Sequence, residues 1–187
     1  MNVEATEIPG VLIVHPDAYT DERGLFYETW SQARYAHAGM PETFVQDNVS
    51  RSSRGVLRGL HFQYPQSQGK LLSVLEGEIF DVAVDIRRGS PTFGRWVGAT
   101  LSAANHVQLY VPAGCAHGFQ ALSDEAVVLY KCTEYYQHGS ERSVLWSDEE
   151  LAIPWTLPPI LSAKDRTAPR LRAIPESALP PYTPAGV

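Results

Sequence analysis

Short apolar runs, separated by Gly, Pro, Asp and Ser, follow one another along almost the whole chain. Residues 79–86 show the pattern most clearly, because Phe80, Val82, Val84 and Ile86 fall on one face of a period-two alternation. Runs of this kind, bounded by turn residues, predict strands. The strands that we expect cover residues 11–14, 25–30, 44–49, 56–63, 71–75, 79–86, 95–101, 106–111, 118–122, 127–136 and 143–146.

Helix signals are scarce by comparison. Ser31 is placed to cap a short helix that ends near Gly39, and residues 147–150 are able to open one helical turn. Many short strands joined by regular turns predict an all-β sandwich or barrel. We find no internal repeat or linker, so residues 1–187 are expected to form one domain. The chain from Pro158 onward, with 172–187 as a proline-rich tail, is expected to wrap the body and then fray.

The composition narrows the class of protein. Hydrophobic residues make up 44% and charged residues 19% of the chain, and the formal net charge is −6. These values are ordinary for a soluble globular protein and argue against a general nucleic-acid binder. No apolar run approaches the roughly 18 residues needed to cross a bilayer, and residues 1–10 lack the blocks of a secretory signal. We therefore expect a cytoplasmic protein without nucleic-acid or membrane partners, in which Cys115 and Cys132 are reduced thiols.

Residues 55–63 carry polar groups where a plain core strand carries Val and Ile. Arg58 and His61 need partners if this strand is buried. Taken alone, His61 is more often a satisfied core histidine than a functional one. A spacing of three aims the two side chains at opposite faces of a regular strand. If both reach one site, we expect a twist or bulge at Gly59; otherwise Arg58 reaches around the barrel mouth.

Two stretches resemble the signatures of the cupin superfamily. Residues 111–119 place Pro, Gly and His at the spacing of its second signature, and residues 55–61 match the first. The resemblance implies a cupin-type jelly-roll barrel with a few short helices. Metal-binding cupins usually carry a second His where Gln63 stands and a Glu a few residues later. In this chain the first acidic residue after Gln63 is Glu76. We therefore predict neither a metal nor another cofactor.

Seven blocks together are similar to the dTDP-4-dehydrorhamnose 3,5-epimerase family. They are residues 44–48, 55–63, 80–87, 90–94, 117–119, 130–131 and 161–165. The similarity extends from about residue 8 to residue 171. It implies an isomerase that converts dTDP-4-keto-6-deoxyglucose to dTDP-4-keto-rhamnose by inverting C3 and C5. Such an enzyme serves dTDP-L-rhamnose synthesis for cell-wall polysaccharide.

Inverting a carbon next to a ketone requires a base, an acid on the opposite face, and stabilisation of the enolate. By resemblance, His61 is the base and Asp165 its hydrogen-bond partner, although Asp165 alone reads as a capping or loop acid. Tyr130 is the acid by the same resemblance, whereas a strand tyrosine is usually packing. Lys70 then lies near the C4 carbonyl, and its ordinary interpretation is a solvated lysine.

The resemblance also assigns residues to substrate binding. Arg58 is suited to hold the diphosphate with its forked donors. Arg23 and Glu28 are expected from the neighbouring subunit, which implies a homodimer whose active site the partner completes. Phe26 and Tyr136 are candidates for stacking on thymine. Further binding positions are Gln46, Asp47, Asn48, His117, Glu141 and Lys164. The chain departs from the family at Leu25–Phe26, where two aromatics are common.

Two alternatives stay open at this point. A single-centre epimerase, acting at only C3 or only C5 of a dTDP-4-keto-6-deoxyhexose in a natural-product pathway, shares nearly every motif. A cupin that binds a sugar nucleotide without turning it over is the other. The combination of His61, Tyr130, Lys70 and Asp165 argues against this second alternative, because a binding module needs no acid and base together.

Overall fold

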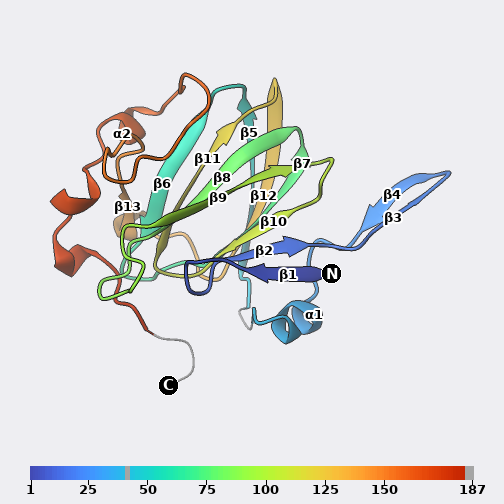
Figure 1. Ribbon diagram of the computed structural model, residues 1–187, viewed down its shortest axis with the longest axis horizontal. Helices are drawn as coiled ribbons and strands as arrows, with labels where there is room; N and C mark the ends of the chain where they lie inside the picture. The colour runs from blue at the N-terminus through green and yellow to red at the C-terminus, as the bar shows by residue number, and fades with distance from the viewer. Residues whose placement is uncertain (41–42, 184–187) are drawn as a thin grey trace.

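Two antiparallel sheets pack face to face in the computed structural model, which describes residues 1–40 and 43–183 (Figure 1). The first sheet contains, in spatial order, β1 (Asn2–Ala5), β2 (Leu12–His15), β10 (Gln108–Val111), β7 (Lys70–Glu76), β12 (Glu125–Cys132) and β5 (Gln46–Ser53). The second contains β13 (Glu141–Ser143), β6 (Leu57–Gln63), β11 (Cys115–Ala121), β8 (Glu78–Asp85) and β9 (Trp96–Ser102). This architecture confirms the predicted all-β jelly roll.

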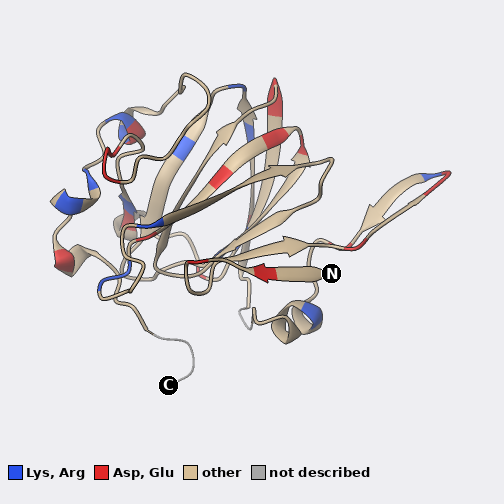
Figure 2. Ribbon diagram, in the orientation of Figure 1, with Lys and Arg blue, Asp and Glu red and all other residues tan. Residues whose placement is uncertain are grey.

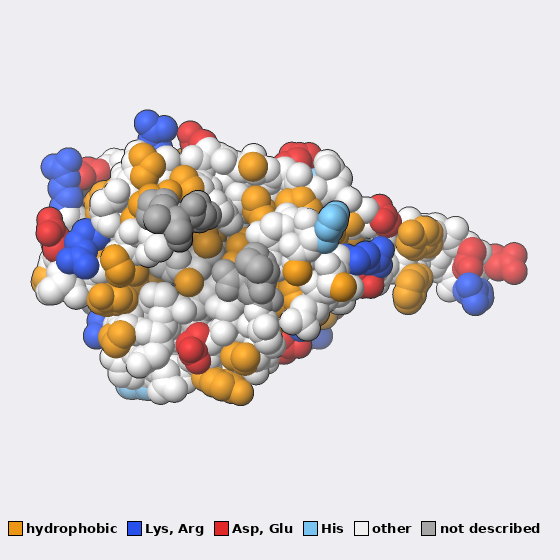
Figure 3. Space-filling view, turned by 90° about the horizontal axis from the view of Figure 1, so that it is seen from below, with side chains coloured by type: hydrophobic (Ala, Val, Ile, Leu, Met, Phe, Trp, Pro, Cys, Tyr) orange, Lys and Arg blue, Asp and Glu red, His pale blue; other side chains and the backbone are white. Residues whose placement is uncertain are grey.

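A separate hairpin leaves the body of the molecule. It consists of β3 (Ala18–Asp21) and β4 (Gly24–Tyr27), which pair only with each other among the described strands. Figure 1 shows it projecting away from both sheets. Figure 3 shows hydrophobic side chains exposed along this projection. They include the cross-strand pair Tyr19 and Phe26, which are 62% and 72% exposed.

The second sheet is buried on both faces. Ile79 and Ala83 of β8 join the cluster between the sheets, whereas Val82 and Val84 point outward into a second cluster. Leu171 and other C-terminal residues complete that outer cluster. Figure 1 shows the C-terminal part, orange to red, running along β6 and β13. The expected wrapping is thus observed through residue 183, while the end for which fraying was expected lies outside the described residues.

The helices are short. Helix α1 (Gln32–His37) begins after Ser31, as predicted, although the Ser31 side chain makes no capping hydrogen bond. Where one helical turn was expected at residues 147–150, the Ala152 amide donates to the Asp148 carbonyl at 2.9 Å, which closes a single turn that does not continue as a helix. The Asp148 carboxylate accepts hydrogen bonds from the Glu150 and Leu171 amides. Sequence reasoning missed α2 (Ala163–Arg166) and the strands β1 and β3. The 3-10 turns are η1 (His138–Ser140), η2 (Leu171–Ala173) and η3 (Glu176–Ala178).

Strand β6 contains the bulge predicted at Gly59. His61 lies opposite His117 of β11, but Arg58 lies opposite Phe119, so β6 carries one extra residue between these pairs. Gly59 has φ +141, and a Cβ there would lie 2.5 Å from the Cα of Gly118. The extra residue brings Arg58 and His61 to the same, inner face of the sheet.

Charged residues of both signs are interspersed along the chain without one extended block of either sign (Figure 2). Within the described part of the chain, no helix is long and apolar enough to span a bilayer.

Candidate active site

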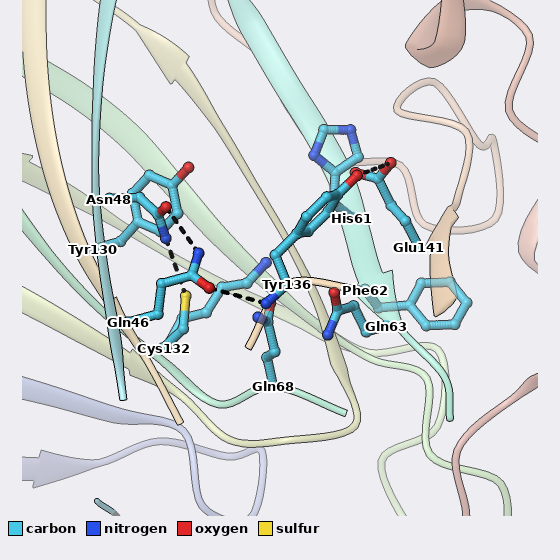
Figure 4. A pocket seen from close by; sticks show the side chains of 11 residues that line it. Gln46, Asn48, His61, Phe62, Gln63, Gln68, Tyr130, Cys132, Tyr136 and Glu141 are labelled. Carbon is cyan, nitrogen blue, oxygen red and sulfur yellow. Dashed lines mark hydrogen bonds between the residues drawn. The ribbon is translucent and has the colours of Figure 1, made fainter. Parts of the chain in front are cut away.

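A pocket of about 290 Å³ opens between the two sheets, at the ends of β5, β6, β7 and β12 (Figure 4). Its lining residues are Gln46, Asn48, His61, Phe62, Gln63, Gln68, Lys70, Tyr130, Cys132, Tyr136 and Glu141. The predicted site residues among them are Gln46, Asn48, His61, Lys70, Tyr130, Tyr136 and Glu141. Strand alternation explains part of the set, since every second residue of β5 and β12 faces inward.

His61 and Asp165 form a close pair at one wall. The Nε2 atom of His61 lies 2.6 Å from Oδ1 of Asp165, whose side chain is only 3% exposed. Asp165 is presented by α2, where Ser162 caps the helix by accepting a hydrogen bond from the Asp165 amide at 3.1 Å. Burial lowers the pKa of His61 below its usual 6.5, against the opposing effect of Asp165. The imidazole is therefore neutral at neutral pH.

The carboxyl of Asp165 keeps its charge in this setting. Burial acts to raise its pKa, but the hydrogen bond from His61 and the nearby Lys164 outweigh burial and hold the pKa below 3.8. A charged carboxylate against one ring nitrogen fixes the orientation of the imidazole.

Tyr130 lies on the opposite wall of the pocket from His61 (Figure 4). It belongs to β12 of the first sheet, where it pairs in register with Asn48 of β5 and Leu72 of β7. Burial raises the pKa of the phenol above 10, so the hydroxyl keeps its proton at neutral pH. Imidazole and phenol thus face one cavity from the two sheets.

Lys70 lies at the start of β7, in register with Cys132. Burial lowers the pKa of its ammonium group from 10.5. Its side chain lines the same pocket as His61 and Tyr130. Among the described lysines and arginines, Lys70 is the one that lines the pocket.

A chain of polar contacts joins the outer part of the pocket to α2. The Tyr136 hydroxyl donates to Oε2 of Glu141 at 3.2 Å, and Nζ of Lys164 donates to Oε1 of the same carboxylate at 2.7 Å. Lys164 precedes Asp165 on α2. Tyr136, Glu141 and Lys164 are therefore brought together at the mouth of the site, although Lys164 itself does not line the pocket.

His117 lies beside His61 but does not line the pocket. Its Nε2 atom lies 2.6 Å from Oδ1 of Asp81, and both side chains are at least nine-tenths buried. The second carboxylate oxygen, Oδ2 of Asp81, is buried without a hydrogen-bond partner among the described residues. A second His–Asp pair thus lies on the inner face of the same sheet, beside the pocket.

Two of the predicted binding residues, Arg58 and Asp47, lie outside the pocket lining. Arg58 is exposed and does not line the pocket; its Nε donates to Oγ of the buried Ser52 at 3.0 Å and its Nη2 to the carbonyl of Arg51 at 3.3 Å. Asp47 instead points to the outer face of β5, where both carboxylate oxygens accept from Nζ of Lys131 at 2.8 Å. The prediction that the Asp47 side chain reaches the pocket is therefore not supported, because Asp47 alternates with the inward-facing Gln46 and Asn48.

The hairpin residues lie away from this pocket. Arg23 pairs with Asp21 at the hairpin tip, and Phe26 is exposed on β4. Glu28 forms an ion pair with Arg34 of α1 at 2.8 Å. Within one copy of the chain, Arg23, Phe26 and Glu28 are not brought to the site.

Gln63 is engaged in hydrogen bonds to the backbone of the loop that carries Tyr136. Among residues 1–40 and 43–183, no group of three or more His, Cys, Asp and Glu side chains is arranged to hold a metal ion.

Sequence reasoning missed some lining residues. Cys132 lies two residues after Tyr130 and shares its strand face, so alternation could have found it. Its thiol sulfur accepts a weak hydrogen bond from Nδ2 of Asn48 at 3.6 Å. Gln68 lies in a connection between strands, and no pattern in the sequence marks it.

Residues 5–173 match the sequence model of a family described as dTDP-4-dehydrorhamnose 3,5-epimerase. A protein of that name from Salmonella typhimurium is 54% identical over 175 residues, which cover 91% of this chain and 96% of the relative. The chain belongs to the dTDP-4-dehydrorhamnose 3,5-epimerase family. The match covers α2 and every strand except β1, and so includes every strand that lines the pocket.

Solved structures in this family share the fold. A 3,5-epimerase from Legionella pneumophila in complex with dTDP-4-keto-L-rhamnose is 52% identical, with a TM-score of 0.95 over 98% of this chain and 99% of that one. A 3'-monoepimerase from Streptomyces bikiniensis in complex with dTDP-quinovose is 34% identical, with a TM-score of 0.87 over 95% and 92% of the two chains. The cupin-like jelly roll is thus common to enzymes that act at two centres and at one.

Proposed function

We propose that this protein converts dTDP-4-keto-6-deoxyglucose to dTDP-4-keto-L-rhamnose by inverting C3 and C5 of the sugar. The observation that carries this function is the placement of the His61–Asp165 pair and Tyr130 on opposite walls of one pocket. Both carbons lie next to the C4 ketone, so each C–H bond is acidic enough for a protein base. The reaction is an isomerisation by proton transfer and needs no redox partner.

The base acts first at each centre. With Nε2 of His61 held against Asp165, Nδ1 is the nitrogen that accepts the proton from C3 or C5. The C–H electron pair forms the C=C bond of an enolate, and the carbonyl electrons move to the C4 oxygen. Asp165 stabilises the imidazolium that results, as its low pKa keeps it charged.

The enolate is then stabilised and reprotonated. The ammonium of Lys70 lies in the same pocket and offsets the negative charge on the C4 oxygen. Tyr130 delivers its hydroxyl proton to the carbon from the opposite face, which inverts the centre. The phenolate regains a proton and His61 loses one to solvent, so the enzyme returns to its starting state with no net change in protons.

The nucleotide occupies the outer part of the site in this proposal. Tyr136 offers its ring to thymine, and the amides of Gln46 and Asn48 offer donors and acceptors nearby. Arg58 is suited to the diphosphate because its exposed guanidinium, held by Oγ of Ser52 and the carbonyl of Arg51, keeps donors free for an anion. The complex of the Legionella relative with dTDP-4-keto-L-rhamnose supports binding of a sugar nucleotide here.

A homodimer is part of the proposal. The projecting hairpin carries Arg23 and Phe26 away from their own pocket, with apolar side chains open to solvent (Figure 3). Docking this hairpin on a second copy covers the exposed apolar surface and supplies Arg23, Phe26 and Glu28 to the partner's site. A cytoplasmic location and a role in rhamnose supply for cell-wall polysaccharide belong to the same proposal.

A single-centre epimerase is the second candidate, favoured by the shared fold of the Streptomyces monoepimerase. We incubate the wild-type protein with dTDP-4-keto-6-deoxyglucose in D₂O and follow deuterium by NMR. The proposed function predicts deuterium at both C3 and C5 and a product of rhamno configuration. Deuterium at one carbon alone identifies the single-centre enzyme. Incorporation at neither carbon contradicts both functions and leaves a binding protein.

A further inference from the structure

The loop that carries Tyr136 has little packing of its own. It connects β12 to η1, and Tyr136 itself is 48% exposed. Besides the hydroxyl contact to Glu141, the position of this half-exposed ring depends on how firmly the loop backbone beneath it is held. Here three glutamine side chains from other elements hold that backbone.

Gln63 holds the loop on both sides of Tyr136. Its Nε2 donates to the carbonyl of Tyr135 at 3.2 Å, and its Oε1 accepts from the amide of Gln137 at 2.7 Å. One side-chain amide thus bonds the residue before Tyr136 and the residue after it. The same Nε2 also donates to the carbonyl of Gln66 at 2.9 Å. Gln63 is 5% exposed, so water has little access to compete for these bonds.

Two other glutamines hold neighbouring backbone groups. Oε1 of Gln46 accepts from the amide of Tyr136 at 3.0 Å, which Figure 4 shows as a dashed line. Nε2 of Gln68 donates to the carbonyl of Glu134 at 2.7 Å. Successive backbone groups from residue 134 to residue 137 are therefore fixed by side chains. Gln46 also lines the pocket as a candidate for contact with the base, whereas the two polar atoms of Gln63 are both used on backbone groups.

We infer that Gln63 is a positioning residue for nucleotide binding, which acts through Tyr136. The inference rests on the proposed function, since it takes Tyr136 as a surface for the base. By bonding the loop on both sides, Gln63 fixes the tyrosine ring over the outer pocket before the nucleotide arrives, so that binding does not bear the cost of ordering the loop.

The chemistry of the amide explains why glutamine suits this position. We call the contacts of Gln63 on both sides of Tyr136 the clamp. The clamp needs a donor and an acceptor at the end of one side chain, because it bonds both a carbonyl and an amide. A carboxylate offers no donor to the carbonyls of Tyr135 and Gln66. A methionine of similar length offers neither function and adds no charge near His61. Gln63→Met therefore removes the clamp while it preserves the approximate volume.

Gln120 provides a matched control. It is 0% exposed, its Nε2 donates to the carbonyl of Leu157, and its Oε1 accepts from the amides of Thr156 and Leu157. It thus clamps a loop in the same manner as Gln63, but that loop carries none of the proposed site residues. Gln120→Met measures what the loss of such a clamp does through stability alone.

The experiment is a double-mutant cycle on dTDP binding. Affinity for dTDP is measured by calorimetry for wild type, Gln63→Met, Tyr136→Ala and the double variant, and kcat is measured by turnover of the keto sugar. We expect Gln63→Met to raise the Kd about 10- to 100-fold, with kcat changed less than about threefold. In the Tyr136→Ala background the same change should raise the Kd less than about twofold, because its effect passes through the ring.

Other outcomes overturn the inference. They are equal effects of Gln63→Met with and without the Tyr136 ring, a Tyr136→Ala variant with unchanged Kd, and a Gln120→Met variant that weakens dTDP binding as much as Gln63→Met does. If Gln63→Met does not fold, Gln63→Asn, which keeps the amide but retracts it, takes its place in the cycle with the same expectations. Failure of the proposed function is separate, since it appears as absent deuterium exchange in the wild-type protein.

Discussion

His61 is held between two opposing influences. Burial disfavours its charged form, whereas the carboxylate of Asp165 favours it, and the net result is a pKa below 6.5. A base needs to be neutral before the reaction and to tolerate charge after it. Burial supplies the first property and Asp165 the second, so both are needed in one pair.

The pH dependence of kcat/KM follows from this balance. Protonated His61 cannot accept a proton, so activity falls as pH drops through the pKa of His61 in the free enzyme. Because that pKa is lowered, we expect the acid limb of the wild-type profile below pH 6.5. Asp165→Asn removes an influence that raises the pKa, so the limb should move to still lower pH. The maximal rate should fall about 10²- to 10⁴-fold, since the imidazolium loses its partner.

A profile measured from pH 4.5 to pH 9 checks this expectation in both proteins. An acid limb that moves to higher pH in Asp165→Asn, or a limb that is unchanged, contradicts the assigned pairing. Thermal unfolding of the variant at the lowest pH serves as the control for loss of folded protein.

Strand β6 shows what could be inferred at the scale of an element. The spacing of Arg58 and His61 required either a bulge at Gly59 or a long reach by Arg58, and the register shift in β6 confirms the bulge. Local alternation was enough for this inference, because side chains three positions apart cannot share one face of a regular strand. The pairing of β6 with β11 could not be predicted from the sequence, because the register of a strand depends on the whole sheet.

Strand β5 and helix α2 show where the sequence was insufficient. Asp47 was grouped with Gln46 and Asn48 through the family resemblance, although alternation places it on the other face, against Lys131. Helix α2 escaped prediction because its four residues carry no periodic signal. For the same reason, the pairing of Asp165 with His61 across 104 positions came from resemblance alone.

At the scale of the whole molecule, the C-terminal part contributes to the pocket of its own chain and the N-terminal hairpin does not. The C-terminal part covers the outer face of the second sheet and also contributes Asp165 through α2. The N-terminal hairpin contributes nothing to its own pocket and exposes Tyr19 and Phe26. This separation agrees with a site that two copies complete together, which is the proposed homodimer.

Complementation tests the exchange of the hairpin between subunits. Arg23→Ala and His61→Asn are each expected to inactivate the homodimer. After unfolding and refolding of an equal mixture, half of the dimers are mixed, and each mixed dimer holds one site with both native residues. Activity should therefore recover to about one quarter of the wild-type value. No recovery, with mixed dimers demonstrated by mass spectrometry, contradicts a site shared between subunits.

The most direct test of the central claim is deuterium exchange by the His61→Asn variant. Asparagine cannot accept the proton, yet it leaves the outer pocket and its nucleotide contacts in place. With dTDP-4-keto-6-deoxyglucose in D₂O, we expect no deuterium at C3 or C5 above the uncatalysed rate, and a Kd for dTDP within about threefold of wild type. Retained exchange at either carbon, by a variant that binds dTDP normally, would show that another group is the base.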